Sequence, residues 1–197
     1  MPATNWPVAL CGVTESLVTT LGPNDRYNVA ALGLYAPGRL SHDSVTARTW
    51  GRTRTWRNFT EHQQGFVQFT RDPVVFVDGA LDIREQDEPV LDSADAWVEV
   101  TVEKLRSRDR DGTHVVDWKL VPEHVEVEQT VVPTYNRAYG AVVEATVATS
   151  RLDVDAYDTE KLRRRIEYCG DVVDRCGGPR EREAFERVTE LAGLERS

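Results

Sequence analysis

The sequence of 197 residues has little cysteine, little lysine and no long apolar run, and each shortage excludes a class of protein. Three cysteines, Cys11, Cys169 and Cys176, are an odd number and indicate no disulfide framework. No apolar stretch approaches the roughly 20 residues that a transmembrane helix needs. A signal peptide has basic residues before its apolar stretch, and no basic residue precedes the short apolar stretch near the N-terminus. We therefore expect a cytoplasmic protein with no membrane partner.

The charge is strongly negative, because 33 acidic residues face 24 basic ones for a net charge of −9. Among the basic residues only Lys104, Lys119 and Lys161 are lysines. An acidic, lysine-poor surface stays solvated at high salt, which is typical of a halophilic source. A GC-rich genome, whose codons favour arginine, explains the same composition, and both explanations stay open. Either way, a protein of this charge is a poor general binder of nucleic acid.

Up to about residue 132 the sequence reads mostly as short strands separated by turn signals. The expected strands cover residues 13–21, 28–35, 40–50, 65–70, 74–77, 96–105, 114–121 and 125–132. One helix is expected at 55–64, with Thr53 or Thr55 as its N-cap and Gly65 as its C-cap. Many short strands favour an antiparallel barrel, although the sequence alone separates a barrel from a sandwich poorly.

The C-terminal part has the period of a helix. Apolar residues recur at helical spacing after Asp158, a good N-cap, and Gly177-Gly178 should end that helix. Pro179 suits the first turn of a second helix. Residues 139–152 are ambiguous, since β-branched residues favour a strand while Thr134 could cap a helix. We expect a barrel over residues 1–132 and a helical segment over 133–197 that packs on it.

Several candidate sites are weak. The four histidines are scattered, with no metal-ligand spacing to another histidine or to a cysteine. Cys169 and Cys176 lie seven residues apart, on one helix face. We expect them to be buried small apolar groups rather than ligands. The run Arg163-Arg164-Arg165 is surrounded by carboxylates, which favours a solvated helix face. No nucleotide-binding glycine motif and no nucleophile elbow is present.

The stretch from Arg48 to Asn58 is the most informative. It places four arginines, three threonines and an asparagine at the start of the expected helix, whose N-terminus offers free N–H groups and a positive dipole. Such a set can bind a phosphate, and Trp50 and Trp56 could cover an aromatic ring. A surface helix whose arginines pair with neighbouring carboxylates explains the same residues equally well.

A resemblance decides between these readings. The segments Glu15–Thr20, Asn28–Gly33, Thr53–Asn58 and Asp72–Phe76, with Tyr135-Asn136-Arg137 farther on, are similar in order and spacing to domain-of-unknown-function family 447. This mainly archaeal family resembles flavin reductases. The resemblance implies an FMN-binding split β-barrel, mainly β with a helical C-terminal segment, usually a homodimer with flavin near the subunit interface. It also favours a helix over residues 139–152.

The resemblance also implies site residues. Thr53, Thr55 and Asn58 match the segment that should hold the FMN phosphate, and the strand from Asn28 to Gly33 should lie along the isoalloxazine edge. Trp56 stands where a tyrosine is usual, and Arg52 where a small residue is often seen. The complete set of expected FMN-binding residues is Thr20, Asn28, Val29, Ala30, Arg52, Thr53, Arg54, Thr55, Trp56, Asn58, Asn136 and Arg137.

The cofactor does not fix the function. FMN accepts hydride or single electrons, and the protein orients it. We expect a flavin-dependent oxidoreductase that uses NAD(P)H or another small-molecule electron donor. A non-catalytic flavin carrier or sensor is the alternative, and a structural protein without cofactor is a third. No catalytic residue is identified.

Overall fold

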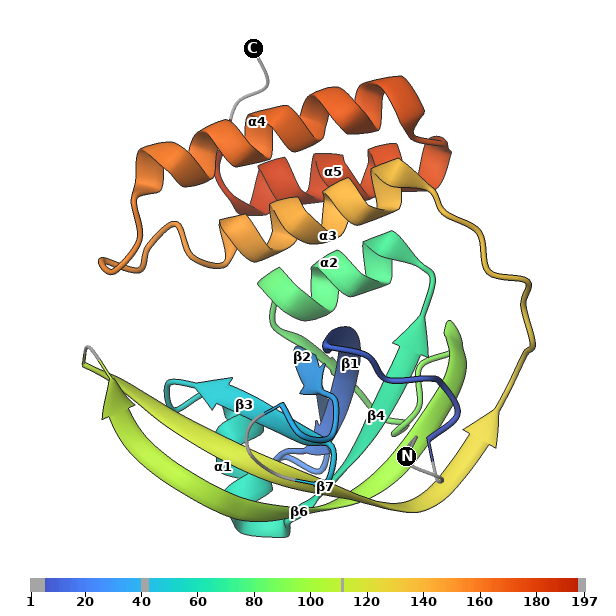
Figure 1. The fold of residues 1–197 in the computed structure, drawn as a ribbon, viewed down its shortest axis with the longest axis vertical. Coiled ribbons are helices and arrows are strands. Elements are labelled where there is room, and N and C mark those ends of the chain that lie inside the picture. Colours follow the sequence, from blue (N-terminus) through green and yellow to red (C-terminus); the bar gives the residue numbers. More distant parts are fainter. Residues whose placement is uncertain (1–5, 40–42, 111, 195–197) are drawn as a thin grey trace. The chain divides into compact units, whose positions relative to one another are not determined.

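The computed structural model describes residues 6–39, 43–110 and 112–194. The contacts divide the chain into two compact units, one of Met1–Arg71 with Arg84–Thr130 and one of Asp72–Ile83 with Val131–Ser197. The described strands and one helix belong to the first unit, and four helices belong to the second (Figure 1).

The first unit is a closed antiparallel barrel. Its strands are β1 (Val13–Leu21), β2 (Tyr27–Tyr35), β3 (Thr46–Trp50), β4 (Gln64–Thr70), β5 (Arg84–Gln86), β6 (Ala94–Arg110) and β7 (Thr113–Val127). Six of them pair in the order β1-β4-β6-β7-β3-β2, and the pairing of β1 with β2 closes the ring. The short β5 adds to the edge of β2. Together with the C-terminal helices, this ring confirms the predicted fold class, a split β-barrel with a helical C-terminal segment.

Alternation along the strands fills the barrel. Residues two apart, such as Val98 and Val100 on β6 or Val116 and Trp118 on β7, point inward and are at most 2% exposed. Helix α1 (Arg54–His62) adds Phe59 to this core, with its ring centroid 5.4 Å from that of Trp118. Burial of these apolar side chains therefore fixes α1 against the barrel.

The second unit is a helical bundle of α2 (Pro73–Leu81), α3 (Arg137–Thr149), α4 (Thr159–Cys176) and α5 (Pro179–Leu191). The predicted core positions Leu162, Ile166, Phe185 and Val188 are buried with Val142 of α3 and with Val77 of α2, which the sequence placed in a strand. No helix among the described residues is long and apolar enough to cross a membrane. That the helices of the C-terminal segment also pack on the barrel stays a prediction.

The expected helices of the tail are confirmed at their ends. The side chain of Asp158 accepts from Lys161 N at 3.1 Å and begins α4. Helix α4 ends at Cys176, before the two predicted glycines, and Pro179 is the first residue of α5. Residues 139–152, left ambiguous by composition, lie mostly in α3.

Other expectations were wrong. Residues 74–77 are not a strand but part of α2, because Asp72 caps the N–H groups of Val74 and Val75 and Pro73 fits the first turn. No separate strand covers 125–132, since β7 continues to Val127 and the described residues after it form none.

The helix caps also differ from those expected. Gln63 in the left-handed conformation, not Gly65, ends α1, and Asn136, not Thr134, begins α3. The predicted strand at 40–50 begins at Thr46 among the described residues, and positions 40–42 lie outside them. The strand β5 was not predicted, because three polar residues carry no alternation.

Candidate functional site

Thr53 is the N-cap of helix α1, one of the two caps predicted. The Thr53 side chain accepts from Trp56 N at 3.2 Å, and its carbonyl accepts from Arg57 N at 3.1 Å. The first turn of a helix has no intrahelical partner for its N–H groups, so those of Arg54 and Thr55 remain as donors for an anion. Thr53 is exposed and Thr55 is buried, which places one hydroxyl at the surface and one beneath it.

The three arginines around this helix start differ in what they contact. Arg54 is hydrogen-bonded to Glu85 of β5 through Nη1. Arg52 stands over the ring of Trp56, with Cζ 5.7 Å from the centroid. Neither Arg52 nor Arg57 forms an ion pair with a described residue, and both are exposed. Arg52 and Arg57 are thus better placed than Arg54 to meet an added anion, and nothing in the sequence had pointed to Glu85.

Arg48, also counted in the arginine-rich stretch, serves another purpose. Its Nε donates to Asp117 Oδ1 at 2.6 Å, and Arg108 Nη1 donates to the other oxygen at 2.6 Å. Burial by itself raises the pKa of Asp117, but the bonds and charges of the two arginines outweigh it and hold that pKa below its usual value. The guanidinium of Arg48 also lies between the rings of Tyr35 and Trp50. The charge of Arg48 is therefore already compensated.

A buried polar cluster connects α1 with β1 and β2. Asn58 donates from Nδ2 to Thr20 Oγ1 at 2.9 Å and to Thr20 O at 3.3 Å. Asn28 is the cross-strand partner of Thr20. All three side chains are at most 6% exposed. The structure thus brings together Thr20, Asn28 and Asn58 of the predicted site, one helical turn beyond Thr55.

Strand β2 has an open stretch along one edge. It pairs with β1 over its whole length, while its other edge pairs with β5 at Tyr27–Val29 and with β3 at Leu34–Tyr35. Along this second edge, residues 30–33 have no ladder partner among the described strands, although they pair with β1 on the first edge. Backbone groups along this stretch are the kind that bond the polar edge of a planar ligand. Ala30 is half-buried, whereas Val29 is buried and alternates to the other face.

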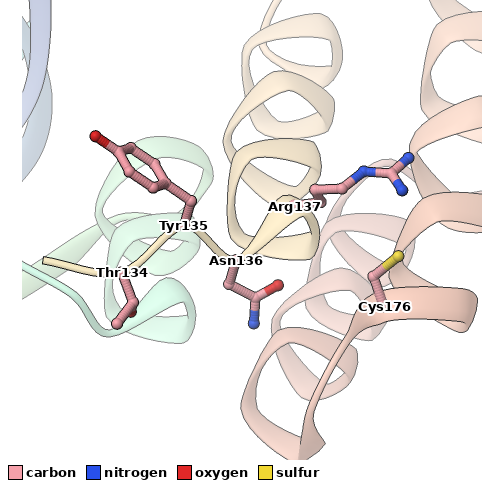
Figure 2. A pocket seen from close by; sticks show the side chains of 5 residues that line it. All are labelled: Thr134, Tyr135, Asn136, Arg137 and Cys176. Carbon is pink, nitrogen blue, oxygen red and sulfur yellow. The ribbon is translucent and has the colours of Figure 1, made fainter.

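The predicted residues Asn136 and Arg137 belong to the second unit. Asn136 caps α3 through Ala138 N at 2.9 Å and donates to Glu181 at 3.0 Å. A cavity of about 390 Å³ is lined by Thr134, Tyr135, Asn136, Arg137 and Cys176. Figure 2 shows Arg137 extending toward the end of α4 that carries Cys176, with Tyr135 directed the other way. Asn136 is thus already engaged by its own helix.

The site offers no metal chemistry of its own. In the parts of the chain that the structure describes, no group of three or more histidines, cysteines or carboxylates is placed to hold a metal ion. The side chains at the start of α1 are threonine, arginine and tryptophan, none of which transfers protons readily near neutral pH. Such an arrangement can bind and orient an anionic ligand.

Models of one protein family match both parts of the chain. The model described as "Protein of unknown function (DUF447) N-terminal domain" matches residues 14–129, and the model described as "Protein of unknown function (DUF447)" matches residues 136–190. These two matches cover most of the 197 residues, including nearly all of strands β1–β7 and of helices α1–α5.

Solved structures with a similar fold are known. The FMN-bound protein MM1853 from Methanosarcina mazei, also assigned to DUF447, is 25% identical, with a TM-score of 0.76 over 91% of this chain and 95% of that chain. The flavin reductase HpaC, solved with NADP+, is 15% identical over 61% of this chain and 81% of that one, with a TM-score of 0.39. The styrene monooxygenase flavin reductase from Pseudomonas putida S12 is 12% identical over 62% and 93%, with a TM-score of 0.40. The last two scores are too low to support a functional argument.

Proposed function

This chain belongs to the DUF447 family, and we propose that it binds FMN, with the phosphate at the start of α1 and the ring along the open edge of β2. The observation that carries the proposal is that two features occur together in one barrel. A capped helix start presents free N–H groups beside exposed arginines, and a neighbouring strand has one edge without a strand partner among the described residues at positions 30–33. The similar DUF447 protein MM1853, described as FMN-bound, supports the same ligand.

The residues fit the chemistry of the ligand. The hydroxyls of Thr53 and Thr55, the guanidinium of Arg52 and the N–H groups of Arg54 and Thr55 would hold the phosphate, because anions are stabilised at helix N-termini and by charge-assisted hydrogen bonds. The buried cluster of Thr20, Asn28 and Asn58 would keep α1 at a fixed position against β1 and β2. Trp56 is half-buried and its indole would shield the site from water. Asn136 and Arg137 are the second candidates for a flavin contact.

The proposed activity is that of an FMN-dependent oxidoreductase, with NAD(P)H or another small molecule as electron donor. When bound, FMN supplies hydride and single-electron chemistry. The protein would bind and orient the flavin, since the side chains at the start of α1 include no general acid. The lack of a general acid among these side chains is also what a non-catalytic flavin carrier or sensor would have. Such a carrier or sensor is therefore the alternative function.

A homodimer is proposed as the assembly. Val13, Trp50, Leu105 and Val127 of the barrel are large apolar residues that are 39–49% exposed. Exposed apolar groups and open strand edges are surfaces that a second subunit can cover.

Titration of the purified protein with FMN and with riboflavin tests the proposal. We expect FMN to bind much more tightly than riboflavin, which has the same ring without the phosphate, and to give the oxidised-flavin band of the bound cofactor. Equal affinities would remove the phosphate from the account, and no binding of either would refute a flavin site. Anaerobic addition of NADH or NADPH to the FMN complex then separates the two functions, since rapid bleaching supports the oxidoreductase and a stable yellow colour supports the carrier.

A further inference from the structure

His114 of β7 contacts the segment that leads into α1 at its beginning. Gly51 N donates to the carbonyl of His114 at 2.7 Å, directly after the last rung of the β3–β7 ladder. Gly51 has a φ of +79°, and a Cβ there would meet nothing within 4 Å. The glycine is thus required for its backbone conformation, which turns the chain from β3 toward Thr53.

The ring of His114 contacts the same segment at its other end. Its centroid lies 5.7 Å from that of Trp56, with an interplanar angle of 87°. Such edge-to-face contacts are favourable for aromatic rings. Trp56 in turn lies beneath Arg52, and the backbone N–H of Trp56 donates to the Thr53 hydroxyl. His114 therefore contacts residues on both sides of Thr53, although more than 50 residues of chain separate them.

The orientation of the His114 ring is itself fixed. Its Nδ1 lies 3.2 Å from Asp109 Oδ1, and its Nε2 lies 3.3 Å from Ser107 Oγ. The order serine, histidine, aspartate is that of a hydrolytic triad. The Asp109 side chain, however, is 81% exposed, whereas the aspartate of such a triad is buried. The array is better suited to holding the ring against Trp56 than to activating the serine.

We propose that His114 is a positioning residue for the anion site at the start of α1. It holds Gly51 through its backbone and Trp56 through its ring, so that Thr53 and the free N–H groups after it keep the geometry that a phosphate needs. This inference rests on the proposed FMN site for the identity of the ligand, but its structural part concerns residues 51–56 alone.

Two measurements on His114→Ala test the inference. The first is amide hydrogen exchange within residues 51–56 without ligand, read at the bonded N–H groups of Gly51 and Trp56, which we expect to accelerate by about tenfold when the ring contact is lost. The second is ligand affinity, with FMN binding expected to weaken by about tenfold while riboflavin binding stays unchanged. His114→Phe keeps an aromatic edge against Trp56 and should restore most of the protection and the affinity.

The chain provides a matched control and a milder variant. His124 lies on the same strand, and its ring centroid is 5.2 Å from that of Trp97. His124→Ala therefore removes an equivalent ring contact elsewhere and should change neither the hydrogen exchange of residues 51–56 nor the FMN affinity. Ser107→Ala with Asp109→Ala removes both hydrogen-bond partners of the ring at exposed positions, so it loosens the ring without endangering the fold and should give an intermediate effect.

The outcomes separate this inference from the proposed function. Unchanged exchange over residues 51–56 in His114→Ala would overturn the inference whether or not FMN binds. Equal losses of FMN and riboflavin affinity would overturn the link to the phosphate. If the wild type binds neither flavin while His114→Ala still accelerates exchange, the proposed function fails and the positioning role of His114 stands.

Discussion

The Asn58 side chain on α1 donates to the hydroxyl of Thr20 on β1 at 2.9 Å, in surroundings where both residues are at most 2% exposed. A buried donor left without its acceptor loses more than the bond itself, because its desolvation is no longer compensated. Thr20→Val removes the hydroxyl acceptor but leaves the longer bond from Asn58 to the Thr20 carbonyl, so we expect the free energy of unfolding to fall by about 0.5–1.5 kcal/mol, the range for one hydrogen bond. Urea denaturation measures this loss.

The double variant gives the control for this prediction. In Thr20→Val with Asn58→Leu both polar partners are gone, so a smaller loss than the sum of the two single losses is expected. Additive losses would show that the pair is not coupled.

Stability at acid pH should depend on Asp117. Its pKa is held below the usual carboxyl value by Arg48 and Arg108 against the opposing effect of burial. A lowered pKa in the folded state stabilises the protein above the unfolded pKa of about 3.9, and this contribution is lost as the pH falls through the lower folded value. Asp117→Asn should cost roughly 1.5–3 kcal/mol at pH 7, the range for a hydrogen bond to a charged group.

The comparison with wild type is made by urea denaturation at several pH values. The stability difference between wild type and Asp117→Asn should be constant above about pH 5 and shrink below pH 4. A difference that stays constant down to pH 2 would mean that the carboxylate charge contributes nothing.

Two glycines in the helical unit should respond oppositely to alanine. A Cβ at Gly170 of α4 would lie 3.0 Å from two ring atoms of Phe185, which is 3% exposed. A Cβ at Gly140 of α3 would meet nothing within 4 Å. Gly170→Ala should therefore destabilise by about 1 kcal/mol or more, and Gly140→Ala should stabilise by about 0.5–1 kcal/mol through helix propensity. Thermal unfolding of the two variants measures both changes in stability. A stability change of the same sign in both variants would contradict the packing of α4 on α5.

The protein should be a homodimer at high salt. Self-repulsion between acidic subunits is screened as the Debye length falls to about 3 Å at 1 M salt. Light scattering in molar salt should give about twice the chain mass of 22.2 kDa. A value equal to one chain under these conditions would argue against the proposed assembly.

Local signals in the sequence predict much of this fold. Alternating apolar residues located most strands of the barrel, and capping residues such as Thr53 and Asp158 located the starts of α1 and α4. The error at α2 has a clear physical cause. Its consecutive valines favour a strand by propensity, whereas the Asp72 cap and burial of Val77 in the helical core decide for a helix.

The site was predicted only in part, because its long-range contacts leave no local pattern. The helix start at Thr53 was expected from its capping residue, and the polar residues Thr20, Asn28 and Asn58, named through motif order, lie together. The pairing of Arg54 with Glu85 and the contact of Trp56 with His114 join residues that are 31 or more positions apart. Only the folded barrel brings such residues together.

The central claim, that the start of α1 holds the FMN phosphate, is tested most directly by Thr53→Ala with Thr55→Ala. Each hydrogen bond to a charged group contributes roughly 1.5–3 kcal/mol, so FMN affinity should fall by on the order of a hundredfold or more. Riboflavin affinity should barely change. Thr60→Ala is the matched control, because Thr60 lies on the same helix with its hydroxyl bonded to Trp56 O at 2.7 Å, away from the helix start.

The decisive quantity is the ratio of FMN to riboflavin affinity, measured by fluorescence titration for the wild type, the double variant and Thr60→Ala. The account predicts that this ratio collapses in the double variant and is preserved in Thr60→Ala. Undiminished FMN binding in the double variant would place the phosphate elsewhere, with Asn136 and Arg137 as the next candidates, and equal losses of both ligands would mean that the threonines act through the fold.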